Sequence, residues 1–118
     1  MIQKIISNSY QKAKKINQWV TFYKSGEQQQ TIIYKYGVIA SYKIWDKRGL
    51  LIEELKTNLE QEGMNTQEQL TSWHKNGNLK SSIIAEYGIV MQKKEWDDKN
   101  QLVLDYQFTD FNYNVLYL

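Results

Sequence analysis

The stretch "SWHKNGNLKSSIIAEYG", Ser72–Gly88, decides the fold, because the chain contains a second version of it. The earlier version is "TFYKSGEQQQTIIYKYG", Thr21–Gly37, and the two align without a gap at a shift of 51 residues. Self-similarity at a fixed period is the signature of a repeat architecture. The sequence therefore predicts two copies of one unit, at about residues 20–55 and 71–106.

The identities between the copies include glycines, tryptophans and turn residues, which a chance alignment would not keep in phase. Gly49 aligns with Asn100, and both residue types tolerate a positive φ. The identical pairs are Lys24 and Lys75, Gly26 and Gly77, Ile32 and Ile83, Ile33 and Ile84, Tyr36 and Tyr87, Gly37 and Gly88, Lys43 and Lys94, Trp45 and Trp96, Asp46 and Asp97, and Leu51 and Leu102.

A shorter period lies inside the copies, in which an aromatic residue is followed four positions later by Gly or Asn. This pattern predicts the end of a strand, a tight turn with one left-handed residue, and a returning strand. Its members are Phe22 and Gly26, Trp45 and Gly49, Trp73 and Gly77, and Trp96 and Asn100. Because one hairpin cannot bury an apolar face alone, neighbouring hairpins must stack. The prediction is an all-β single domain over residues 1–118, an antiparallel meander of repeated β-hairpins.

Two segments are less regular. Residues 3–9 align with residues 54–60 and predict a first strand, whereas Ile2, Ile5 and Ile6 also begin a helical stripe, so a short N-terminal helix stays open. The polar linker at 56–69 predicts a wider turn around Gly63.

The composition excludes several classes of protein. The 118 residues include no Cys, so a disulfide framework and a thiolate metal site are both excluded. No apolar run is long enough to span a bilayer, and the first residues lack the apolar region of a secretory signal. The expected location is the cytoplasm, without stable membrane insertion.

The charge is divided unevenly along the chain. Residues 1–59 hold ten Lys and Arg against four acids, and residues 60–118 hold five against nine, so +6 and −4 give the net +2. An acidic half argues against a nucleic-acid partner, because Lys and Arg drive phosphate binding. A protein partner fits this segregation better.

The repeated units "WHKNGNLKSSIIAEYG" and "IWDKRGLLIEE" resemble the MORN-repeat variants of YwqK-type bacterial antitoxins. The resemblance covers about residues 20–107. It implies an antiparallel meander of hairpins and a role as the immunity partner of a toxin. A second small Gly of the family pattern is missing, and Ser41 and Gln92 stand near its place.

Catalytic chemistry is not indicated. His74, the single histidine, aligns with Tyr23 at the flank of a turn and lacks catalytic or metal-binding partners in the pattern. Asp46 and Asp97 align at turn starts, where Asp bonds the backbone two residues on. We therefore expect no enzyme activity, no cofactor and no metal site.

The aromatic residues divide into two groups. Trp45, Trp73 and Trp96 follow the repeat and are predicted to pack on the inner face of the sheet. Tyr residues that break the repeat are better interface candidates, because Tyr is a favoured interface anchor. The expected toxin-binding residues are these tyrosines and the acids of the second half: Tyr34, Tyr42, Tyr113, Glu86, Glu95, Asp97, Asp98 and Asp105.

The leading functional hypothesis is a non-catalytic antitoxin that binds and occludes a cognate toxin. The alternative is a MORN-like scaffold or membrane-surface module that uses Lys12, Lys14 and Lys15. The apolar C-terminal segment 113–118 is expected to form an edge that pairs with a second copy or with the toxin. The toxin, the binding face and the stoichiometry are left open by the sequence.

Overall fold

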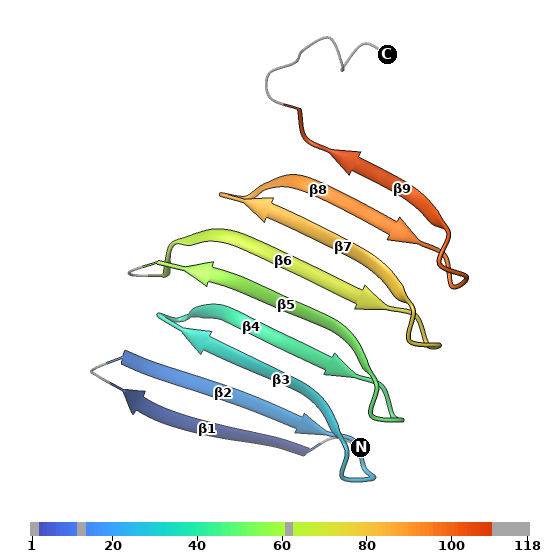
Figure 1. Ribbon diagram of the computed structural model, residues 1–118. Helices are drawn as coiled ribbons and strands as arrows, with labels where there is room; N and C mark the ends of the chain where they lie inside the picture. Colours follow the sequence, from blue (N-terminus) through green and yellow to red (C-terminus); the bar gives the residue numbers. More distant parts are fainter. Residues whose placement is uncertain (1–2, 12–13, 61–62, 110–118) are drawn as a thin grey trace.

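The computed structural model describes residues 3–11, 14–60 and 63–109, with side chains from residue 17 onward. These residues form one antiparallel sheet of nine strands in sequence order (Figure 1). The strands are β1 (Gln3–Gln11), β2 (Lys14–Phe22), β3 (Gln28–Lys35), β4 (Val38–Trp45), β5 (Leu51–Leu59), β6 (Asn65–Trp73), β7 (Leu79–Glu86), β8 (Ile89–Trp96) and β9 (Leu102–Gln107). The predicted all-β meander is confirmed.

The shift of 51 residues carries over strand by strand. Adding 51 to the bounds of β2, β3 and β4 gives the bounds of β6, β7 and β8. The register shifts recur as well, at the bond before Phe22, Trp45, Trp73 and Trp96. Since β-bulges bend and twist a strand, their recurrence gives each hairpin the same local geometry.

The four turns that follow β2, β4, β6 and β8 share one hydrogen-bond pattern. In the turn after β6, His74 N–H donates to the Asn78 carbonyl and Gly77 N–H donates to the His74 carbonyl, at 2.8 and 2.9 Å. The fourth residue of each turn is left-handed: Gly26, Gly49, Gly77 and Asn100 have φ between 68° and 95°. This is a three-residue hairpin loop with a left-handed closing residue, as predicted. We call these four turns, residues 23–27, 46–50, 74–78 and 97–101, the turn rim.

Of the two less regular segments, the first forms the predicted strand and the second lacks the expected wider turn. The predicted first strand is confirmed as β1, and the alternative short helix does not form, because residues 3–11 pair along their whole length with β2 and gain a backbone ladder. The linker at 56–69 is mostly strand, and β5 and β6 continue through it. Its turn at Gly63 is no wider than the others, since Glu60 N–H and Gly63 N–H make the same two bonds.

The sheet has a single layer within the described residues, with principal extents of 50 × 38 × 19 Å. The expectation of an inner face for the tryptophans is therefore wrong. Three described residues are buried, Ala40, Thr21 and Thr66. A sheet without a covering layer is stabilised mainly by cross-strand side-chain pairs.

Register divides the side chains of the sheet between two faces, because residues paired across strands lie on the same face. One face, which we call face A, carries a continuous row at mid-strand that we call the central row. The central row consists of Trp19, Ile32, Tyr42, Leu55, Leu70, Ile83, Lys93 and Tyr106. The neighbouring row on the opposite face, face B, consists of Gln18, Ile33, Ser41, Lys56, Gln69, Ile84, Gln92 and Gln107. The sheet is therefore apolar along the middle of face A and mostly polar along the middle of face B.

A side chain at a left-handed turn position should cost stability in proportion to strain and crowding. Gly77 has a φ of +90° and open space where a Cβ atom would lie, so Gly77→Ala should destabilise the fold by about 1 kcal/mol through the backbone alone. Gly63→Ala should cost more, because its Cβ would lie 3.2 Å from Cβ of Tyr36.

Urea unfolding of both variants measures this difference, with Asn100→Gly as the control. Asn100 already has a φ of 68°, so its replacement by Gly should leave stability nearly unchanged. An equal loss in Gly63→Ala and Gly77→Ala would contradict the crowding at Gly63.

Candidate functional site

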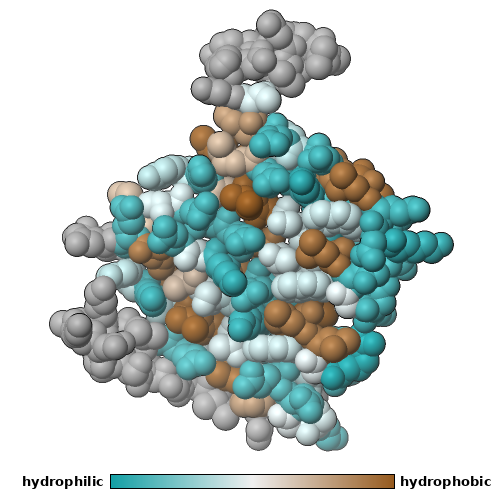
Figure 2. Space-filling view, in the orientation of Figure 1, coloured by the Kyte–Doolittle hydropathy of each residue, from teal (hydrophilic) through white to brown (hydrophobic). Residues whose placement is uncertain are grey.

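Two surfaces gather polar or apolar groups in an arrangement that could bind a partner: the turn rim and face A. The turn rim lies along one side of the sheet in Figure 1, and that side is hydrophilic in the matching view of Figure 2. On the face shown in Figure 2, apolar side chains stand in separate patches with hydrophilic residues between them.

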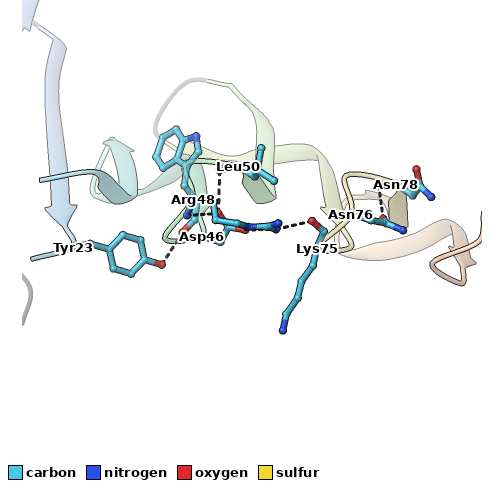
Figure 3. A network of polar contacts seen from close by, with 8 residues as sticks. Tyr23, Asp46, Arg48, Leu50, Lys75, Asn76 and Asn78 are labelled. Carbon is cyan, nitrogen blue, oxygen red and sulfur yellow. Dashed lines mark hydrogen bonds and ion pairs between the residues drawn. The ribbon is translucent and has the colours of Figure 1, made fainter. Parts of the chain in front are cut away.

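Asp46 holds its own turn together, as Figure 3 shows. Its Oδ1 accepts hydrogen bonds from Arg48 N–H and Leu50 N–H at 2.8 and 3.1 Å. The Arg48 guanidinium bonds its Oδ2 at 2.8 Å. Hydrogen bonds from the Arg48 side chain hold the pKa of Asp46 below its usual value; desolvation opposes this, and the two backbone donors add to the lowering.

Asp97 repeats this arrangement in the last turn. Its Oδ1 accepts from Lys99 N–H and Gln101 N–H, both at 2.9 Å. The prediction that Asp46 and Asp97 serve their turns is confirmed. A substitution of Asp97 would therefore disturb the turn as well as any partner.

His74 has a structural contact that its sequence position did not reveal. Its Nε2 lies 2.8 Å from the carbonyl oxygen of Trp96, and the Tyr23 hydroxyl donates to the carbonyl of Trp45 at the same distance. The two bonds are related by the repeat. Because a carbonyl only accepts, Nε2 of His74 carries the proton.

Further hydrogen bonds join the second, third and fourth turns of the rim. Arg48 Nη2 donates to the Lys75 carbonyl at 2.6 Å, which links the second and third turns (Figure 3). The amides of Asn76 and Asn78 both donate to the Asp98 carbonyl, at 2.7 and 2.9 Å, which links the third and fourth turns. The second, third and fourth turns therefore form one hydrogen-bonded structure, in which the carbonyls of Lys75 and Asp98 already accept hydrogen bonds.

A groove of about 900 Å³ opens where Arg48 bridges the second and third turns. It is bordered by four cations and by two acids, one of which, Asp46, is paired with Arg48. Its lining residues are Asp46, Lys47, Arg48, Ile52, Trp73, His74, Lys75, Asn76, Lys80 and Asp98. The groove is open to solvent, and Ile52 and Trp73 place apolar surface beside its charged groups, so it offers both electrostatic attraction and apolar contact.

Face A contains two of the tyrosines predicted to bind a partner. Tyr42 belongs to the central row, and its hydroxyl donates to the Glu53 carboxylate. Burial raises the pKa of Tyr42 to about 12, and the hydrogen bond and negative charge of Glu53 act in the same direction. Tyr34 lines a depression of about 230 Å³ on face A with Trp19, Ile32, Gln30 and Thr21.

The predicted acidic residues do not form one cluster. Glu95 pairs with Leu104 on face A, whereas Asp105 pairs with Lys94 on face B. Glu86 ends β7, at the opposite side of the sheet from Asp98 in the turn rim. Tyr113 lies outside the described residues.

The central row was missed by the sequence reasoning, although its signal was present. Ile32 and Ile33 recur as Ile83 and Ile84, and such a pair places one Ile on each face. Only the register shows that the first of each pair joins Trp19, Leu55 and Leu70.

In the part of the chain that the structure describes, no group of three or more His, Asp or Glu side chains is arranged to hold a metal ion. The same residues include no apolar helix of membrane-spanning length.

No family model matches the chain, and no curated protein matches it. Among solved structures, the crystal structure of a GtfA/B complex bound to UDP and GlcNAc contains a chain with a TM-score of 0.28 and 14% identity. The match covers 97% of this chain and 27% of that chain. At this TM-score the likeness carries no argument about fold or function.

The His74 bond should contribute to stability through its donor and not through its charge. His74→Phe removes the donor from the Trp96 carbonyl and should cost about 1 kcal/mol in urea unfolding. His74→Tyr should restore most of this loss, because Tyr23 makes the equivalent bond. Equal stability of the Phe and Tyr variants would show that the bond contributes nothing.

The Asp46 carboxylate should make stability depend on acid pH. Because its folded pKa is lowered, its contribution is present above the unfolded value of 3.8 and is lost as pH falls through the folded pKa. Asp46→Asn keeps Oδ1 but lacks the charge, so it should be less stable than the wild type at about pH 6, and the difference should shrink as pH falls below 3.8. Urea midpoints across this range measure the effect, which added salt should reduce. A difference that does not change with pH would contradict the assignment.

Proposed function

We propose that this chain is a non-catalytic protein-binding module that docks a partner protein on face A. The observation that supports it most is the central row, which runs across the single-layer sheet with no second layer over it among the described residues. A sheet with one apolar face ordinarily covers that face with another element. Here a partner would supply the covering layer.

The contrast between the middle rows of the two faces favours face A. The adjacent row of face B has Gln, Ser or Lys at six of its eight positions, which water solvates well. The central row has one charged residue, Lys93, near its β9 end. Burial of the central row would therefore remove more apolar surface from water than burial of the adjacent row of face B, at a smaller desolvation cost.

The positions at which the two copies differ also favour face A. Tyr34 and Tyr42 lie on face A, and their equivalents in the second copy are Ala85 and Lys93. Both copies form the same strands with different residues at these positions, so the fold of the repeat does not require tyrosine there. Tyr residues are favoured at interfaces because their rings bury a large area at a small entropy cost.

In its narrower form the proposal makes the chain an antitoxin that occludes a cognate bacterial toxin. This form rests on the resemblance of "WHKNGNLKSSIIAEYG" to YwqK-type antitoxins. Inhibition of the partner's isolated activity by the purified chain tests it. A scaffold role is the alternative, and flotation with anionic liposomes would reveal the membrane-surface form.

The two isoleucines of β7 provide a matched test of the binding face. Ile83 lies in the central row of face A and Ile84 lies on face B, and both are half-buried. Ile83→Asn should weaken binding of the partner at least tenfold, because it places an amide in the apolar interface. Ile84→Asn should bind like the wild type.

Affinity capture at low salt from the native cell, followed by titration of the purified partner, measures both variants. Urea midpoints show whether they fold equally well. One stoichiometric partner that is lost only with Ile83→Asn supports docking on face A. Equal affinity of the two variants, or loss with Ile84→Asn alone, would rule out face A.

A further inference from the structure

We propose that the segment seated on face A is a basic amphipathic α-helix of the partner protein. This inference rests on the proposed function and adds the chemistry of the occupant to it. Three features of face A support it: the length of the central row, the charges beside the row, and the poor fit of other occupants.

The apolar part of the central row has the length of an ordinary helix. It runs from Trp19 on β2 to Ile83 on β7, across six strands. Five spacings of about 4.8 Å give about 24 Å. An α-helix of about 16 residues, with its 1.5 Å rise per residue, covers this distance. Apolar side chains at i, i+3, i+4 and i+7 would follow the row.

Carboxylates lie on both sides of the central row. Glu53 and Glu95 are two positions from the row towards the turn rim, and Glu68 is two positions from it towards the other side. Lys93 is the one ammonium group at the regularly paired positions of face A in β3–β9. A helix with Lys or Arg on both flanks of its apolar stripe would therefore meet opposite charge on both sides.

Two of these carboxylates are anchored. Glu53 accepts from the Tyr42 hydroxyl, and Glu68 accepts from the Asn65 amide at 2.6 Å. A held carboxylate loses little side-chain entropy when it pairs with an incoming cation. One carboxylate on each flank is therefore organised before a partner binds.

A second copy of this chain fits face A less well. Two A faces in contact would bring Glu53, Glu68 and Glu95 towards the same groups of the other copy, where like charges repel. An added β-strand pairs with the edge of a sheet and leaves its faces uncovered. A helix and a second sheet are the two common ways to cover an apolar face, and a helix with cations on both flanks of its apolar stripe matches the carboxylates on both sides of the row.

The depression beside Trp19 and Tyr34 gives the helix an anchoring point. Its volume of about 230 Å³ on face A suits one large apolar side chain near an end of the helix. At the other end the row reaches Lys93, where apolar contact stops.

A designed peptide tests the inference directly. The probe is an 18-residue helix with Leu along one stripe and Lys on both flanks, and its control has the same Leu positions with Glu in place of Lys. Calorimetric titration at low salt compares the wild-type chain with Ile83→Asn, Ile84→Asn and the triple variant E53Q/E68Q/E95Q. Gln keeps an acceptor oxygen for Tyr42 and Asn65, so the triple variant removes charge with little change of shape.

The Lys peptide should bind the wild type and Ile84→Asn equally, and both Ile83→Asn and the triple variant at least tenfold more weakly. Circular dichroism should show the bound peptide as a helix. Equal affinity for the Glu peptide, or undiminished affinity of the triple variant, would overturn the inference.

Titration of the natural partner separates this inference from the proposed function. If Ile83→Asn loses the partner while the triple variant keeps full affinity, docking on face A stands and the basic helix is wrong. If both variants keep full affinity, face A is not the docking surface and both proposals fail.

Discussion

Backbone pairing within one layer is the constraint on which the rest of this structure depends. Each inner strand from β2 to β8 satisfies its N–H and C=O groups with two neighbours, but none of the described strands packs against a second sheet or a helix. Side chains are therefore shielded by their neighbours on the same face, which explains why most strand residues are half-buried and few are buried. The register of the strands decides which side chains meet, so it also decides where apolar surface accumulates.

The turns keep this register constant. A left-handed residue such as Gly77 closes each turn of the rim after the same number of residues, and a bulge follows at the same pair in each hairpin. A slip of one residue in any strand would move that strand's member of the central row from face A to face B. The side chains of His74, Arg48 and Asn76 then tie adjacent turns together, so that neighbouring hairpins hold one another in place.

The sequence predicts the strands and turns well because their signals are local. An aromatic residue followed four positions later by Gly or Asn locates each turn of the rim, and the shift of 51 residues carries the bounds of one copy to the other. The single layer was not predictable, because half-buried strands show the same alternation whether or not a second layer covers them. The sequence shows His74 only as a variable residue at the flank of a turn. Its contact with Trp96 at the end of β8 spans 22 residues, so no local pattern reveals it. Residue type and charge alone predict the site residues, whereas the register of the strands distributes them over both faces.

The repeat explains how such a sheet can acquire a binding surface without losing its fold. Positions that are identical in both copies, such as Gly77 and Trp96 with their equivalents, set the turns and the register. Positions in the middle of the strands need only present a side chain that packs beside its cross-strand neighbour. The central row accepts Tyr42 in one copy and Lys93 in the other, and both lie beside an apolar side chain of the preceding strand. The chemistry of face A can therefore change from strand to strand while the backbone ladder stays the same, which lets the sheet combine an apolar stripe with flanking carboxylates.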